Sequence, residues 1–305
     1  MGKKIEKKLV NEKELEQKEP EKKSKSIKYL LIIPVVAIIL IILFFLLLQS
    51  PVEASDEAYA QLIIEYGIVD VKQLGGPWSS AENGMLLYQS DTIRTAENTS
   101  ASIILFKSSI IRLDSNTEVT LREIAKEIET NVSIDQNSGR TWNTVRKISG
   151  IDNYEVQTPT TVASVRGTSF LVNVTEEGGT SYGVVNGSIN VSSKKNGTII
   201  DTINLKENES VKIDPEKIYK PLEKEELKEE EWIEKNKEKD EEMIQQEKVE
   251  LYKRIQQYIP QLKERYGITD EEIDALLEGY LRGYYDDYEI PDYVPDWILD
   301  LLELP

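Results

Sequence analysis

The chain has 305 residues, with 37 Lys and Arg against 55 Asp and Glu, a net charge of −18, and neither His nor Cys. The missing residue types exclude disulfides, thiolate nucleophiles, zinc sites built on Cys or His, and catalysis with an imidazole base. The sequence contains no catalytic or metal-binding motif, so we predict no enzyme activity, no cofactor and no metal ion. Paired carboxylates remain the weak enzymatic alternative, because so many acidic residues supply chance pairs.

The N-terminal part predicts a membrane anchor. Residues 1–28 carry ten Lys and six Glu, a net charge of +4, which leaves −22 for the rest of the chain. From Tyr29 to Leu48 the chain has twenty uncharged residues, about 30 Å as an α-helix, which matches a bilayer core. The Lys-rich flank places residues 1–28 in the cytoplasm and residues 51–305 outside the cell membrane. A cleaved signal peptide is the alternative, but the apolar run is long and favours an uncleaved signal-anchor.

The central region predicts a β domain. After a linker over residues 49–61, residues 62–213 show short apolar alternations broken by turn residues at close spacing. A period of two residues indicates strands, so we expect a mainly β fold of many short antiparallel strands, in a sandwich or a short solenoid. Asn186-Gly187 predicts a two-residue hairpin, because a type I′ turn needs positive φ at both central residues. Lys195-Asn196-Gly197 makes a similar but weaker case.

Asn residues in N-x-[ST] sequences are glycosylation acceptors if the region is exported and the host has the machinery. Such matches also arise by chance in a β sequence rich in Asn, Ser and Thr, so both interpretations stay open. The Asn residues are Asn98, Asn131, Asn173, Asn186, Asn190, Asn196 and Asn208.

Three motifs of the central region occur in a fixed order: DTIRT (Asp91 to Thr95), IIRLDSNTEV (Ile110 to Val119) and TPTTVASVRGTSF (Thr158 to Phe170). With these motifs, about residues 63–213 resemble the FecR domain family. The resemblance implies one membrane helix, a β domain outside the cytoplasm, and recognition rather than catalysis. The motif residues that we expect to be structural are Asp91, Arg94, Thr95, Thr158, Pro159, Arg166, Gly167 and Thr168.

The sequence departs from the family pattern in three places. Ser90 stands where the family usually has Gly, and Lys107-Ser108-Ser109 replaces an Asp-Gly-Ser turn. The best-known members relay the occupancy of an outer-membrane transporter to a cytoplasmic sigma factor. Here residues 1–28 are too short for the helical anti-sigma domain of those members and resemble a charged, solvated tail. Direct control of a sigma factor therefore does not simply carry over.

The stretch TPTTVASVRGTSFLV has the composition of a β corner. Gly167 accepts positive φ and suits a sharp corner between two strands. Arg166 is the only charge in this stretch, and we interpret it as a clamp on carbonyl groups or a carboxylate. Binding of an anionic ligand or a sugar is the alternative. Trp78 and Trp142 are expected to pack in the core or at an edge rather than to stack on sugars.

Residues 214–305 predict an acidic helical region. Asp214-Pro215 has the composition of a helix start, and a charged helix with one apolar stripe is expected from about Leu222 to Tyr266. Thr269 and Glu272 form a capping box for a helix that ends near Gly283. These helices pack on one another or on the β domain; the alternative is a partner-docking arm.

Together these patterns predict a single-pass, membrane-anchored extracytoplasmic protein that binds or senses, with an envelope or membrane protein as its partner. It would relay an envelope signal through protein contact. A cell-surface scaffold or adhesion protein without signalling is the alternative, and a carboxylate-dependent envelope hydrolase is a weaker one. The charge of −22 outside the membrane argues against a nucleic-acid partner, which would require a basic surface.

Overall fold

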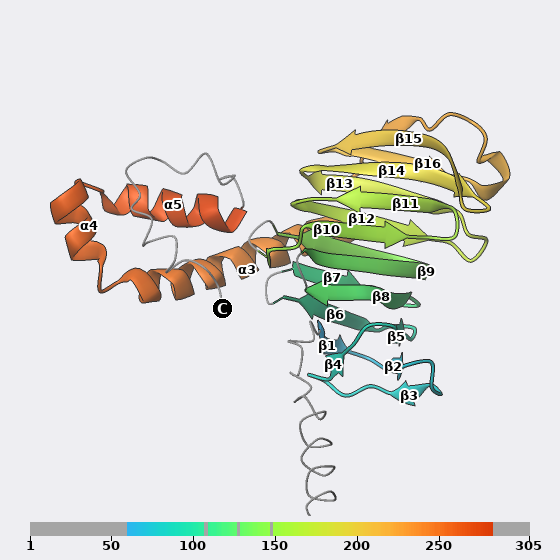
Figure 1. The fold of residues 1–305 in the computed structure, drawn as a ribbon, viewed down its shortest axis with the longest axis horizontal. Coiled ribbons are helices and arrows are strands. Elements are labelled where there is room, and N and C mark those ends of the chain that lie inside the picture. Colours follow the sequence, from blue (N-terminus) through green and yellow to red (C-terminus); the bar gives the residue numbers. More distant parts are fainter. Residues whose placement is uncertain (1–59, 107–108, 127–128, 147–148, 283–305) are drawn as a thin grey trace, which may run out of the picture. The chain divides into compact units, whose positions relative to one another are not determined.

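The computed structural model describes residues 60–106, 109–126, 129–146 and 149–282 (Figure 1). All of them belong to one compact unit, Asp56–Pro305. The predicted cytoplasmic tail, the membrane segment from Tyr29 to Leu48 and the C-terminal tail after Arg282 lie outside the described residues. Within those four ranges, no helix has the length and apolar character needed to cross a membrane.

Most of the described chain is β-structure, as expected from the alternating pattern. The strands in chain order are β1 (Ala60–Tyr66), β2 (Val69–Lys72), β3 (Ser79–Ser80), β4 (Leu86–Leu87), β5 (Thr92–Thr95), β6 (Ser100–Leu105), β7 (Ser109–Leu113), β8 (Glu118–Lys126), β9 (Thr130–Val145), β10 (Asn153–Gln157), β11 (Thr161–Val165), β12 (Thr168–Val174), β13 (Thr180–Asn186), β14 (Ser188–Lys195), β15 (Thr198–Lys206), β16 (Glu209–Ile213) and β17 (Lys224–Glu226). The predicted mainly β fold with many antiparallel strands is confirmed.

The strand pairings form two ladders that share β9. Ladder A runs β4-β1-β6-β7-β9-β12-β13-β16-β17. Ladder B runs β3-β2-β5-β8-β9-β10-β11-β14-β15, and its β9–β10 pair is parallel. In Figure 1 the strands stack from β3 to β15. Buried side chains from both ladders, such as Ile93 of β5 and Phe170 of β12, belong to one hydrophobic core.

Strand β9 passes from one ladder to the other at Gly139. Its first half pairs with β8 and β10, and from Gly139 onward it pairs with β7 and β12. Gly139 has a φ of +80°, and a Cβ there would lie 2.4 Å from the Cα of Thr117. Only glycine fits both the left-handed backbone and this close approach. The stretch lies between the IIRLDSNTEV and TPTTVASVRGTSF motifs and belongs to neither, yet in the structure it is the longest strand described.

The two predicted Asn-Gly turns have opposite outcomes. The prediction of a hairpin at Asn186-Gly187 is wrong, because β13 and β14 do not pair with each other. Strand β13 pairs with β12 and β16, whereas β14 pairs with β11 and β15. Only Gly187 of that pair has positive φ, at +84°, so the chain makes a crossover between ladders instead of a type I′ turn. The weaker prediction is confirmed, because Asn196 (φ 51°) and Gly197 (φ 78°) connect the antiparallel pair β14 and β15.

The acidic region begins differently from its predicted form. Asp214 caps only a short 3-10 helix, η2 (Pro215–Lys217), by accepting a hydrogen bond from the Glu216 amide at 2.9 Å. The predicted start of the long helix at Leu222 is wrong. Strand β17 extends ladder A there, and α3 (Glu231–Ile255) begins after it. Two helices follow, α4 (Ile259–Tyr266) and α5 (Asp270–Arg282).

The predicted capping box of α5 is confirmed. The Glu272 carboxylate accepts a hydrogen bond from the Thr269 amide at 2.8 Å, and the Thr269 hydroxyl accepts one from the Glu272 amide at 3.2 Å.

The helices have a hydrophobic core of their own. Residues from the end of α3, from α4, from α5 and from the connection between α4 and α5 form a buried cluster that shares no member with the β core. Its buried members are Leu251, Ile255, Ile259, Leu262, Ile268, Ile273, Leu276, Leu277 and Leu281.

Candidate functional site

The second half of β9 presents a polar face away from the β core. Alternate residues of a strand point to opposite sides, and Val145 belongs to the β core. The residues on the opposite side contact helix α3. We call this surface the helix-binding face; it consists of Arg112 on β7, Arg140, Trp142, Thr144 and Arg146 on or directly after β9, and Ser169 on β12.

The buried carboxylate of Asp240, on α3, lies at the centre of this face. It accepts hydrogen bonds from Nη1 of Arg112 at 2.5 Å, from Nε1 of Trp142 at 3.0 Å and from Oγ1 of Thr144 at 2.8 Å. The hydroxyl of Ser169 adds a longer contact of 3.3 Å. The Arg112 and Asp240 side chains are only 7% and 12% exposed. Neighbouring β-strands therefore surround one carboxylate with hydrogen-bond donors.

Arg146 ties the strand to two helices. Its nearly buried guanidinium forms an ion pair with Glu247 of α3. Its Nη2 also donates to the carbonyl oxygen of Leu281, in the last turn of α5, at 2.7 Å. A cation at the C-terminal end of a helix interacts favourably with the helix dipole. Arg146 thus recognises both a carboxylate and a helix end.

The N-terminal end of α3 is held by an arginine and two indoles. The Arg140 guanidinium lies 4.1 Å from the centre of the Trp232 ring and 3.2 Å from a Glu230 oxygen, and it also pairs with Asp114 at 2.5 Å. Trp142 meets Trp232 edge to face, with ring centres 6.0 Å apart. These cation–π and aromatic contacts each contribute roughly 0.5–2 kcal/mol.

A further ion pair joins α3 to the first strand. Lys239 donates to Glu65 on β1 at 2.6 Å, and Ser102 donates to the same carboxylate at 2.9 Å. Burial acts to raise the pKa of Glu65, but the hydrogen bonds from Lys239, Ser102 and Ser100 outweigh it and hold the pKa below its ordinary value. Glu65 is therefore charged near neutral pH, as its pairing with Lys239 requires.

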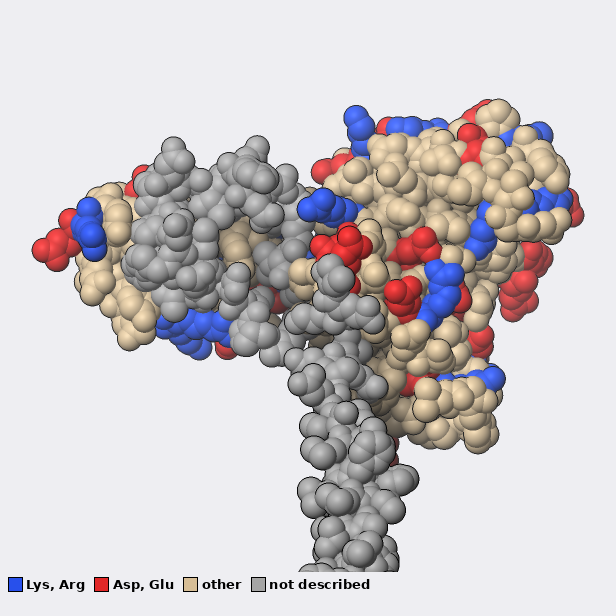
Figure 2. Space-filling view, viewed as in Figure 1, with Lys and Arg blue, Asp and Glu red and all other residues tan. Residues whose placement is uncertain are grey.

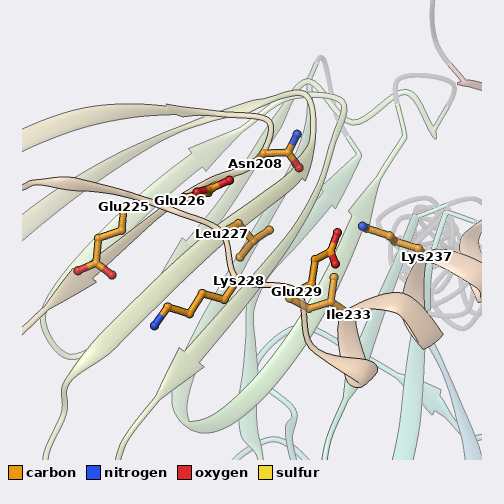
Figure 3. A pocket seen from close by; sticks show the side chains of 8 residues that line it. All are labelled: Asn208, Glu225, Glu226, Leu227, Lys228, Glu229, Ile233 and Lys237. Atoms are coloured by element: carbon orange, nitrogen blue, oxygen red, sulfur yellow. The ribbon is translucent and has the colours of Figure 1, made fainter.

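Beside the start of α3 lies a pocket of about 680 Å³ between β17 and the helix. It is lined by Asn208, Glu225, Glu226, Leu227, Lys228, Glu229, Ile233 and Lys237 (Figure 3). In Figure 3 the apolar side chains of Leu227 and Ile233 lie between Glu225 on one side and Lys237 on the other. The lining mixes both charge signs and holds no convergent set of donors or acceptors, so the helix-binding face remains the stronger candidate.

The first family motif lies at the end of the ladders that contains β3 and β4. Asp91 is buried and accepts hydrogen bonds from the backbone amides of Leu74 at 3.2 Å and Tyr88 at 2.9 Å. Arg94 pairs with Asp70 at 2.9 Å and lies 4.2 Å from the centre of the partly exposed Trp78 ring. The Thr95 hydroxyl donates to the carbonyl oxygen of Asp114 at 2.6 Å. These residues fix loops and strand ends, far in the sequence from α3.

The TPTTVASVRGTSF motif contains a network of buried hydroxyl groups. The Thr158 hydroxyl lies 2.6 Å from that of Thr161 and 3.0 Å from that of Thr180, and the Thr161 hydroxyl lies 2.7 Å from that of Tyr182. Burial raises the pKa of the Tyr182 phenol, so the phenol stays neutral. Pro159, between these threonines, is exposed. The hydroxyls are partnered within the β domain.

The corner of the same motif separates β11 from β12. Gly167 has a φ of +59°, and the Thr168 hydroxyl donates to the carbonyl oxygen of Ser188 at 2.9 Å. Arg166 is exposed, and its side chain makes no hydrogen bond or ion pair with the residues that the structure describes. The structure thus gives no support for the guanidinium clamp that the sequence suggested.

The possible glycosylation sites divide by exposure. Asn131 and Asn173 are partly buried in strands β9 and β12. The other Asn side chains of this set are exposed: Asn98, Asn186, Asn190, Asn196 and Asn208. The exposed set is the one that a glycosyltransferase could reach in the folded protein.

Sequence reasoning misses the residues of the helix-binding face, apart from Trp142. Trp142 is buried as predicted, but it packs under α3 and not in the β core. A signal is present in the alternation of large and charged residues at Arg140, Trp142, Thr144 and Arg146. Asp240 and Glu247 also follow Ile233 at heptad spacing, on the helix for which the sequence predicts an apolar stripe.

Charges of both signs are interspersed on the face of the molecule in Figure 2, where no continuous basic surface is visible.

Among the described residues, no group of three or more Asp and Glu is arranged to hold a metal ion. All buried side-chain nitrogen and oxygen atoms of that part have a hydrogen-bond partner. The donors around Asp240 are therefore already satisfied by the helix itself.

Two solved structures are distantly similar to this chain. Two crystal structures from Parabacteroides distasonis, of a protein named "putative anti-sigma factor", match with TM-scores of 0.37 and 0.36 at 17% and 18% identity. Each match covers 44% of this chain and 59% of the other. Similarity at this level carries no argument about function.

No curated protein matches the sequence. A family model described as "FecR protein" matches residues 91–190. That range begins at the DTIRT motif and includes β9, the β11–β12 corner and the helix-binding face. The resemblance to the FecR domain family is thereby confirmed for residues 91–190.

Proposed function

We propose that this protein is a membrane-anchored, extracytoplasmic binding and sensing protein that relays an envelope signal through contact with another protein. The observation that carries the proposal is the helix-binding face, where the FecR-like β domain holds a helix through Asp240 and its four donors. Such a surface recognises a protein segment by charge and shape. The match to the FecR family model also supports a regulatory role.

The membrane anchor is part of this proposal. It is supported by the uncharged run from Tyr29 to Leu48 and by the Lys-rich residues before it. In this arrangement residues 51–305 lie outside the cytoplasm, and the partner is an envelope or membrane protein.

The test is crosslinking in the native membrane. A photo-reactive amino acid is placed at exposed positions, Tyr219 near the end of the β domain and Tyr252 on α3, which are 67% and 38% exposed. Illumination of intact cells is expected to give an adduct with one envelope protein. A control chain that lacks residues 29–48 is expected to lose that adduct, because it no longer reaches the membrane.

Two outcomes would contradict the proposal. Protease added outside the cytoplasmic membrane should degrade residues 51–305, and full protection of that part would reverse the proposed topology. Absence of an adduct from every exposed position, in cells that carry the stimulus-responsive system intact, would remove the relay function and leave a tether or scaffold.

A further inference from the structure

Helix α3 connects two hydrophobic cores but contributes little to either along most of its length. Of its residues, Leu251 and Ile255 belong to the helical core, and Ile244 packs against that core. None of its residues belongs to the β core. Between the two cores, the buried positions of α3 include the polar residues Asn236 and Asp240. The attachment of α3 to the β domain is therefore dominated by charged and hydrogen-bonded contacts.

Such an attachment gives specificity more than stability. Bringing two charges out of water costs several kcal/mol per ion, so a buried ion pair adds little net stability although it discriminates strongly between partners. The pairs Arg112–Asp240 and Arg146–Glu247 are of this kind. The rest of the helix surface is rich in Glu and Lys, and these side chains are well hydrated when the helix is exposed to water. The large apolar side chains at this contact are Trp232 and Ile233 of α3 and Trp142 of β9. The other contacts that hold α3 on the strands are polar.

We propose that the helix-binding face is a docking site for an acidic helix of a partner protein, and that α3 occupies this site until the partner displaces it. The inference rests on the proposed function and names the chemistry of its partner. The occupant is specified by charge complementarity: a carboxylate for Arg112, Trp142 and Thr144, and a second carboxylate for Arg146. An aromatic ring of the partner lies against the Arg140 guanidinium and meets Trp142 edge to face, as Trp232 does.

The experiment uses the full chain in detergent micelles and a fluorescent probe peptide. The probe is a helical peptide built from Ala, Gln and Lys. It contains one Trp, one Asp and one Glu, placed at the spacing of Trp232, Asp240 and Glu247. In the variant Asp240→Lys, an ammonium group faces the Arg112 guanidinium and expels α3. We expect the probe to bind this variant about tenfold or more tightly than the wild type, within the usual range for coupled binding equilibria.

Matched variants separate displacement from general damage. Glu242→Lys makes the same charge change at an exposed position of the same helix, and it is expected to bind the probe like the wild type. The double variant Asp240→Lys with Arg112→Glu reverses the ion pair. Because Arg112 is also a ligand of the probe, closure is measured here by hydrogen exchange, and the α3 amides are expected to regain their protection. Hydrogen exchange should rise in α3 of Asp240→Lys while the β9 amides stay protected, which shows that the β domain remains folded.

Three results would overturn the inference. Probe binding that is equal in the wild type and in Asp240→Lys would show that α3 does not compete for this face. Equal binding of a probe with Asn and Gln in place of Asp and Glu would remove the carboxylate recognition. If Asp240→Lys instead exchanged α3 between two copies and eluted as a dimer that ignores the probe, the occupant would be a second copy. None of these results depends on the anchor or the natural partner.

Discussion

Gly139, at the point where β9 changes ladders, allows a sharp test of how the fold is built. The change is Gly139→Ala. The backbone there has a φ of +80°, and the added Cβ would lie 2.4 Å from the Cα of Thr117 and 2.6 Å from the carbonyl oxygen of Asn116. Both neighbours are backbone atoms of the turn between β7 and β8, so no side-chain rotation relieves the overlap.

The expected loss in stability has two parts. A left-handed backbone costs an L-residue roughly 1–2 kcal/mol, and forcing atoms into a packed site costs roughly 1–3 kcal/mol more. We therefore expect Gly139→Ala to lower the free energy of unfolding by about 2–5 kcal/mol. That loss is a large share of the roughly 5–15 kcal/mol typical of a folded domain.

Gly197→Ala is the matched control. Gly197 has a similar φ of +78°, but no described atom lies within 4 Å of the place that a Cβ would take there, so only the backbone cost applies. Urea unfolding followed by tryptophan fluorescence measures both variants, and an unchanged m-value ensures that the same surface is exposed. If Gly139→Ala were no less stable than Gly197→Ala, the close approach of β9 to the 116–117 turn would be refuted as a reason for glycine.

Three further changes test other parts of the structure. Ser90→Gly relieves the left-handed φ of 72° at the residue before Asp91 and should raise the free energy of unfolding by about 0.5–1 kcal/mol in urea titrations. Leu277→Ala, in the helical core, should cost roughly 2–5 kcal/mol and lower a calorimetric transition of the helices without moving that of the β domain. Because the pKa of Glu65 is lowered in the folded state, the advantage of the wild type over Glu65→Gln should be full above pH 4.5 and disappear as the pH falls through the lowered pKa, as measured by unfolding at several pH values.

The sequence predicts individual strands well because alternation is a local property. Stretches such as Thr168–Val174 alternate between buried and half-buried positions, as the pattern requires. The order of pairing is not local. Gly187 has the same sequence signal as a hairpin glycine, yet a Cβ there would lie 2.8 Å from the carbonyl oxygen of Gly167, at a crossover between ladders. Nothing within a few residues of Asn186 distinguishes these two uses of positive φ.

The candidate site is hidden in the sequence for a related reason. Asp240 is buried by strands that lie 71 to 128 residues away in the sequence, at Ser169 and Arg112. In a helix so rich in Glu, Asp and Lys, one carboxylate among many carries no mark of burial. Charge patterns on a surface helix normally indicate solvent exposure. The pairing of Asp240 with an arginine can be recognised only once both ladders are assembled.

The position of Glu65 connects displacement of α3 with the first strand that the structure describes. Glu65 belongs to β1, the first described strand after the predicted anchor, and it pairs with Lys239, next to Asp240 on α3. A partner that removes α3 from the helix-binding face also removes this ion pair. The Glu65 carboxylate then keeps only the hydroxyls of Ser100 and Ser102 as partners in β6. The strand that follows the predicted anchor in the sequence thus has different contacts in the two states, which is the minimum that the proposed relay requires.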